Sequence, residues 1–150
     1  MKIFAMIPAR YGAKRFPGKL MQLLGDKTVI LRTYENTVAT GLFDEVMVVT
    51  DSDIIFQEIM SHGGKAKMSK GQHESGSDRI AEAIADMEVD IVVAINGDEP
   101  FIAREPLQLL LSLFDGKAGE SVQVASLVQE LKEQKFIDDP NYVKVALDKQ

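Results

Sequence analysis

The stretch DIVVAINGDEP, residues 90–100, decides the fold of this chain. Residues 90–95 are mostly apolar, which predicts a buried strand, and the polar run from Asn96 to Pro100 follows it directly. Two more apolar runs have the same character, at residues 2–7 and 44–50. We expect these three runs to form the centre of one sheet, with the first strand ending at Pro8.

Segments with helical spacing separate these strands. Gly41 and the pair Gly63-Gly64 are helix stops, Asp51 or Ser52 can cap the second helix, and Ser75 or Ser77 can cap the third. Strands that alternate with helices predict an α/β fold with a mainly parallel sheet flanked by helices. The expected helices cover residues 28–40, 53–62, about 77–87 and 105–114.

The other segments are loops and short strands. Loops are expected at residues 9–26, which contain several glycines and a proline, and at the polar stretch 69–76. A short strand is expected at residues 65–68, and two later strands at residues 121–128 and 142–147. No repeat, low-complexity segment or domain linker is evident.

Composition excludes several classes of protein. The 150 residues are 45% hydrophobic and 27% charged, which suits one globular domain with its own core. There is no cysteine, so disulfides and zinc–thiolate sites are excluded, and there are only two histidines, His62 and His73. No apolar run approaches a membrane span, and the N-terminus does not resemble a signal peptide. We therefore expect a soluble cytoplasmic protein without membrane insertion.

The charge distribution points to a local anion site. The net charge of −6 argues against nucleic-acid binding, yet residues 9–20 hold four cations and no acid. Gly12 and Gly18 allow backbone amides to approach a phosphate, so the loop is either a triphosphate cradle or a solvated basic loop. It is not a P-loop, because Leu20 stands where a Ser or Thr is needed. The cations are Arg10, Lys14, Arg15 and Lys19.

Acidic residues follow the other two central strands, and ligands of open α/β sheets bind at these strand ends. Asp98, opposite the basic loop, is either a magnesium ligand or a cap of the next turn, since Mg²⁺ takes one or two carboxylates plus phosphates. Asp51 and Asp53 are better explained as helix caps, and His73 as a surface histidine. Residues 75–79 open a helix, where Arg79 and free amides could hold a phosphate or read a polar base.

Together these segments resemble the 3-deoxy-manno-octulosonate (KDO) cytidylyltransferases, over residues 2–148. The resemblance implies a Rossmann-like nucleotidyltransferase fold. The matching motifs are Ile7-Pro8-Ala9-Arg10-Tyr11, Arg15-Phe16-Pro17-Gly18-Lys19, Val49-Thr50-Asp51, Gly63-Gly64, His73-Glu74-Ser75-Gly76-Ser77-Asp78-Arg79, Asn96-Gly97-Asp98-Glu99-Pro100 and Asp139-Pro140-Asn141-Tyr142-Val143-Lys144-Val145.

The resemblance also implies an activity and its residues. The family transfers CMP from CTP to the anomeric hydroxyl of an acidic eight-carbon sugar, for lipopolysaccharide biosynthesis, and releases pyrophosphate. Arg10, Lys19 and Asp98 would be catalytic, with Asp98 as the ligand of the cofactor Mg²⁺. The residues expected to bind substrate or nucleotide are Ala9, Arg10, Arg15, Lys19, Ser75, Gly76, Arg79, Asn96 and Gly97.

Two departures from the family bear on function. Asn96 stands where the family usually has Gln, which would favour an amino-substituted sugar if this side chain touches the acceptor. Family members also extend well beyond 150 residues. The chain is therefore expected to be the nucleotide-binding portion of such an enzyme, without the C-terminal sugar-binding and dimerisation part. Alone it would be a poor catalyst, and it would form a homodimer or self-associate otherwise.

Three alternatives differ from this interpretation. The acceptor could be sialic acid or another acidic sugar, which product analysis would separate. The chain could be a CTP-binding remnant without catalysis, which would bind and not turn over. A dinucleotide-binding oxidoreductase domain is disfavoured, because the first loop lacks a G-x-G-x-x-G pattern.

Overall fold

The computed structural model describes residues 1–12 and 16–146. Within them the chain divides into two compact units, Met1–Glu105 and Pro106–Gln150, and the division falls inside a helix rather than in a linker. None of the described helices is long and apolar enough to cross a bilayer.

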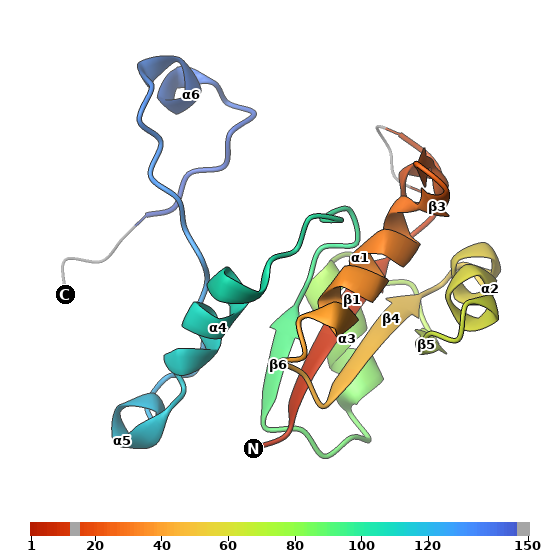
Figure 1. Ribbon diagram of the computed structural model, residues 1–150, viewed down its shortest axis with the longest axis horizontal. Coiled ribbons are helices and arrows are strands. Elements are labelled where there is room, and N and C mark those ends of the chain that lie inside the picture. The colour runs from red at the N-terminus through yellow and green to blue at the C-terminus, as the bar shows by residue number, and fades with distance from the viewer. Residues whose placement is uncertain (13–15, 147–150) are drawn as a thin grey trace. The chain divides into compact units, whose positions relative to one another are not determined.

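A four-stranded parallel sheet forms the centre of the first unit (Figure 1). The strand order is β5-β4-β1-β6, so the three apolar runs predicted as central strands are neighbours. The register pairs Met6 with Met47 on one side and with Ala94 on the other. The bounds are β1 Ile3–Ala9, β4 Glu45–Thr50, β5 Ala66–Met68 and β6 Ile91–Ala94.

Strand β1 continues through Pro8, where we expected it to end. The backbone oxygens of Lys2 and Met6 accept from residues of the β6 side, and the oxygen of Ile3 accepts from Asp44 on the β4 side. Even-numbered positions of β1 therefore point their backbone groups toward β6. Pairing with β6 stops at Met6, so the missing N–H of Pro8 falls where no ladder bond is needed.

Helices cover both faces of this sheet, and most of them have the bounds that their caps predict (Figure 1). The Thr28 hydroxyl caps α1, and the Ser52 and Ser75 hydroxyls accept from the third residue after each of them at α2 and α3. Helix α3 ends at Ile84, three residues before the predicted end. The helices are α1 Val29–Ala39, α2 Asp53–Ser61 and α3 Gly76–Ile84.

The core lies on both sides of the sheet. Met6 and Val49 pack with Ile80 and Ala83 of α3 on one face. On the other face lie α1 and α2 (Figure 1), whose Ile30, Ile55 and Ile59 side chains are completely buried. This placement leaves the carboxyl ends of β1, β4 and β6 as the places where polar loops follow the strands.

The predicted loop at residues 9–26 contains short elements. A 3₁₀ turn, η1 (Lys19–Met21), is followed by a small antiparallel hairpin of β2 (Leu23–Leu24) and β3 (Lys27–Thr28). Gly25 supplies the positive φ of 75° that the hairpin turn requires. The hairpin leads into α1 and so fixes the C-terminal end of the basic loop.

The second unit has little regular structure. Helix α4 (Arg104–Ser112) enters it, and α5 (Gly116–Gly119) and α6 (Gln134–Asp138) follow. The strands predicted at residues 121–128 and 142–147 are wrong as far as they are described: residues 121–128 and 142–146 form no strand, and Leu147 lies outside the described residues. The physical reason is that these segments have no ladder partner in the described chain.

Candidate functional site

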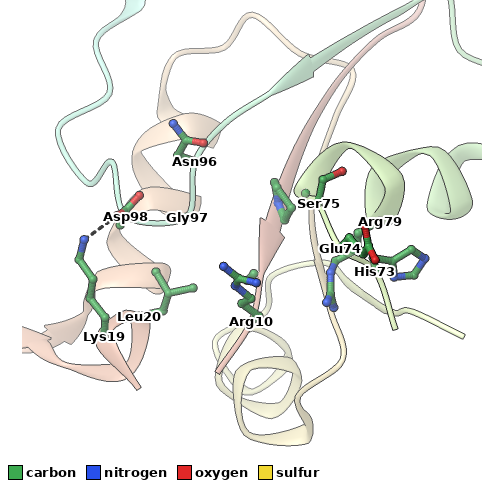
Figure 2. Close-up of a pocket in the computed structure, with 13 residues that line it drawn as sticks. Arg10, Lys19, Leu20, His73, Glu74, Ser75, Arg79, Asn96, Gly97 and Asp98 are labelled. Atoms are coloured by element: carbon green, nitrogen blue, oxygen red, sulfur yellow. Dashed lines mark hydrogen bonds and ion pairs between the residues drawn. The ribbon is translucent and has the colours of Figure 1, made fainter. Parts of the chain in front are cut away.

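A cavity of about 430 Å³ opens at the carboxyl ends of β1 and β6 (Figure 2). Four separate segments of the sequence line it: the end of β1, the turn η1, the start of α3 and the loop after β6. Its lining residues are Pro8, Ala9, Arg10, Lys19, Leu20, His73, Glu74, Ser75, Gly76, Arg79, Asn96, Gly97 and Asp98. The structure therefore brings together every described residue that the sequence predicted for substrate, nucleotide or metal. The predicted Arg15, with Lys14, lies outside the described residues.

One wall of the cavity carries a cation opposite a carboxylate. Lys19 Nζ, from η1, donates to Asp98 Oδ2 at 2.6 Å, and both side chains are about half exposed (Figure 2). Gly18, with φ of 71°, precedes the turn and lets the chain reverse into it. Arg10 enters the same cavity from the end of β1. Two cations and one carboxylate thus face a space large enough for a small anionic ligand.

The opposite wall is the beginning of α3. Ser75 caps this helix by accepting from Asp78 N at 3.1 Å. Gly76 lies so near Pro8 that a Cβ there would come within 3.0 Å of the proline ring. The absence of a side chain at position 76 therefore lets α3 approach the end of β1.

Gly97 fits the floor of the cavity equally closely. A Cβ on it would lie 3.1 Å from Ile30 and 3.4 Å from the Pro8 carbonyl oxygen. Its own carbonyl oxygen accepts from the buried Thr33 hydroxyl of α1 at 3.0 Å. Beside it, Asn96 donates to Glu99 Oε1 at 2.7 Å, so both side chains belong to the same turn.

Arg79 lines the cavity with its charge already paired. The side chain is only 4% exposed, and it donates to Asp51 Oδ2 at 2.8 Å and to Ser69 Oγ at 3.0 Å. The Arg79 hydrogen bond holds the pKa of Asp51 below its ordinary value, although burial acts in the opposite direction. The interpretation of Asp51 as a helix cap is wrong: Ser52 caps α2, and Asp51 instead holds an arginine 28 residues away.

His73 is not the surface histidine that the polar loop suggested. Its side chain is 11% exposed, and its Nε2 lies 3.1 Å from Glu82 Oε2. Together with Pro8, Leu20 and Glu74, it completes the cavity lining that sequence reasoning did not assign. Two sequence signals marked His73 and Glu74: they open the motif of residues 73–79 that carries the family resemblance, and they directly precede the capping Ser75.

The arrangement suits an anionic, nucleotide-sized ligand. Cations and free amides at strand ends and at a helix start are typical phosphate-binding groups. The described residues contain no group of three or more His, Asp or Glu side chains that could hold a metal ion. A divalent cation at Asp98 would therefore need ligand oxygens from the substrate or from water as well, as Mg²⁺ often has.

Comparisons with known proteins agree with this geometry. The sequence profile described as cytidylyltransferase matches residues 4–150. The chain is 60% identical over 148 residues to a 3-deoxy-manno-octulosonate cytidylyltransferase of Flavobacterium johnsoniae, covering 99% of this chain and 61% of that protein. It is 39% identical to an 8-amino-3,8-dideoxy-manno-octulosonate cytidylyltransferase of Shewanella frigidimarina, again covering 99% of this chain and 61% of that protein.

A solved structure shares the fold as well. The synthetase of CMP-2-keto-3-deoxy-manno-octonic acid, in complex with CTP, superposes with a TM-score of 0.71 at 38% identity. The match covers 75% of this chain and 46% of that one. The chain thus spans about three fifths of the length of the curated relatives named above.

Proposed function

The chain belongs to the cytidylyltransferase family, and on that premise we propose that it forms the CTP site of an enzyme that makes CMP-KDO. The reaction transfers CMP from CTP to the anomeric hydroxyl of 3-deoxy-manno-octulosonate. The observation that carries the proposal is the single cavity in which Arg10, Lys19, the start of α3 and Asp98 meet.

The cations of the cavity would bind the triphosphate. The sugar hydroxyl oxygen attacks the α-phosphorus of CTP, a new P–O bond forms, and the bond to the β-phosphate oxygen breaks to release pyrophosphate. The hydroxyl proton is lost to solvent. Arg10 and Lys19, which line the cavity, would neutralise the charge that moves onto the leaving group. Such transfers depend on positioning and charge more than on a nucleophile.

Asp98 would hold Mg²⁺, which supplies charge neutralisation on the phosphates when bound. The fit rests on the chemistry of the donor: one carboxylate, about half exposed, at the rim of a cation-lined cavity. This matches the preference of Mg²⁺ for one or two carboxylates combined with substrate phosphates. Lys19, which holds Asp98 at 2.6 Å, would then be released toward the phosphates.

The start of α3 would receive the nucleoside. Ser75 and Gly76 present a capped helix start to the cavity, and the close packing of Gly76 on Pro8 sets the width there. Arg79, paired with Asp51 and almost fully buried, would shape this wall and would not act as a free cation.

The second candidate is the same reaction with an amino-substituted octulosonate as acceptor. Asn96 favours this candidate, because the family that the chain resembles usually has Gln at this position. Asn96 lines the cavity, and its side chain donates to Glu99 in the same loop. The 60% identical relative carries the unsubstituted sugar in its name, which favours KDO. Product analysis with both sugars present in equal amounts separates the two.

The decisive experiment measures nucleotide binding and pyrophosphate release by this chain with Mg²⁺ and KDO. CTP is compared with UTP, ATP and GTP. Release with CTP alone supports the proposed reaction. CTP binding without release supports a CTP-binding portion that needs the rest of the enzyme for turnover. No preference for CTP over the other three nucleotides overturns the proposal.

A further inference from the structure

The 69–75 loop brings three side chains to the cavity, and it has little regular structure of its own. It joins β5 to α3, and His73, Glu74 and Ser75 at its end line the cavity. A loop without a strand partner needs other acceptors for its amides. What supplies them determines how firmly this wall of the cavity is held.

Glu82 accepts from two amides of the loop and also contacts the side chain of His73. Its Oε1 accepts from Lys70 N at 2.7 Å, its Oε2 accepts from Gly71 N at 3.2 Å, and Oε2 also lies 3.1 Å from His73 Nε2. The amide of Lys70 is the largest cause that lowers the pKa of Glu82 below its ordinary value, and His73 adds to it. One carboxylate on α3 therefore gathers three donors from the loop.

The same helix holds the beginning of the loop. Arg79 stands three residues before Glu82 on α3, on the same side of the helix, and it donates to Ser69 Oγ at 3.0 Å. Ser69 N in turn donates to the Thr50 carbonyl oxygen at the end of β4. Since the loop ends at Ser75, the cap of α3, one short helix fixes it at its start, its middle and its end.

His73 depends on Glu82 for its place. Its Nε2 faces the Glu82 carboxylate at 3.1 Å, and the other ring nitrogen, Nδ1, faces away from that contact. This Nδ1 is buried and has no hydrogen-bond partner among the described residues. Figure 2 shows His73 among the residues that line the cavity, together with Glu74 and Arg79. Without Glu82, no described side chain would form a hydrogen bond or ion pair with the ring.

We propose that Glu82 is a positioning residue for nucleotide binding, which acts by holding the 69–75 loop and His73 against α3. Glu82 itself does not line the cavity, so its effect on the ligand passes through the loop. The inference rests on the proposed CTP site and adds to it a residue outside the cavity that tunes affinity.

The test combines CTP titration with amide exchange measured by NMR on the 150-residue chain. The variants are Glu82→Gln, which keeps the size and one acceptor oxygen, and Glu82→Ala. The matched control is Asp86→Asn, a carboxylate just after the same helix that pairs with Lys67 and lines no part of the cavity. Val48 and Val49, completely buried in β4, report whether the fold is intact.

We expect the Lys70 and Gly71 amides to exchange faster in Glu82→Ala, with Val48 and Val49 unchanged. CTP affinity should fall about tenfold in this variant and less in Glu82→Gln, because a charge-assisted contact is lost or weakened. Asp86→Asn should bind CTP as the parent chain does.

Three results would overturn the inference. CTP affinity could stay unchanged while the loop amides exchange faster, which would make Glu82 an anchor without influence on the ligand. Val48 and Val49 could lose protection together with the loop, which would make the role one of global stability. If the parent chain itself fails to bind CTP, the proposed function fails, and this inference falls with it.

Discussion

Lys19 and Asp98 are 79 positions apart in the sequence and form an ion pair of 2.6 Å at the rim of the cavity. Both side chains are about half exposed, so the pair contributes little to folding. The pair matters because the proposed phosphate-binding cation, Lys19, is neutralised by the proposed metal-binding carboxylate, Asp98. Binding of nucleotide and of Mg²⁺ should therefore be coupled through this pair.

Asp98→Asn tests the coupling. Without Mg²⁺, we expect this variant to bind CTP several-fold more tightly than the parent chain, because Lys19 is free and a negative charge is gone. With Mg²⁺, the order should reverse, since the metal has lost its carboxylate. Calorimetric CTP titrations with and without Mg²⁺ measure both, with Asp86→Asn as the control. Weaker binding of Asp98→Asn under both conditions would refute the coupling.

The Asp51–Arg79 pair should make stability depend on pH. The pKa of Asp51 is depressed in the folded state, so its contribution is present above the ordinary value of about 4 and is lost as pH falls through the folded value. Asp51→Asn leaves the buried guanidinium without its counter-charge. We expect a loss of about 1–2 kcal/mol at pH 7, less than for a fully buried pair because Asp51 is 40% exposed. Urea unfolding at pH 7 and below pH 3 measures the difference, which should shrink at the lower pH. An equal difference at both would exclude this explanation.

Substitution of the two capping serines distinguishes an effect on stability from an effect on ligand binding. Ser75 and Ser52 both cap helices of nine residues, and Ser75 alone of the two lines the proposed CTP cavity. Replacing either with Ala should cost about 1 kcal/mol of unfolding free energy. Only Ser75→Ala should also weaken CTP binding. Thermal unfolding and CTP titration of both variants check this, and equal CTP affinities would argue against a nucleotide at the start of α3.

The second unit should promote self-association. Val124 and Val143 are 89% and 90% exposed, and burying such side chains between chains is favourable. We expect concentration-dependent association that weakens about tenfold when both are replaced by Thr, as sedimentation velocity would measure. If the parent chain sediments as a monomer at every concentration, this prediction and the expectation of a homodimer are both contradicted.

The fold was predictable where local signals and the sheet agree. The runs at residues 2–7, 44–50 and 90–95 became β1, β4 and β6, and Ser52 and Ser75 cap the helices for which they were candidates. The structure of residues 121–128 and 142–146 was not predictable in this way. An apolar pattern shows that a segment can pair as a strand, but it does not show that a partner strand exists. Residues 121–128 and 142–146 form no strand.

The residues that line the cavity were largely predictable from the sequence, and the contacts that support them were not. Lys19 and Asp98 stand in short motifs of the loops that follow β1 and β6. Arg79 is paired with Asp51, and His73 is paired with Glu82. Each partner lies in another element, at a sequence separation that no local pattern indicates. Asp51 resembles a cap before α2 in the sequence, and only the tertiary structure gives its side chain to Arg79.

Pro8, at the end of β1 beside the cavity, limits the hydrogen bonding of the sheet through its covalent structure. Because its nitrogen carries no hydrogen, Pro8 cannot donate a further ladder bond to the backbone that follows β6, and the pairing of the two strands ends at Met6. The end of the ladder at this point is therefore set by the backbone of Pro8 and not by the other residues that line the cavity. Substitution of those other side chains should therefore leave the end of the ladder in place beside the proposed ligand site.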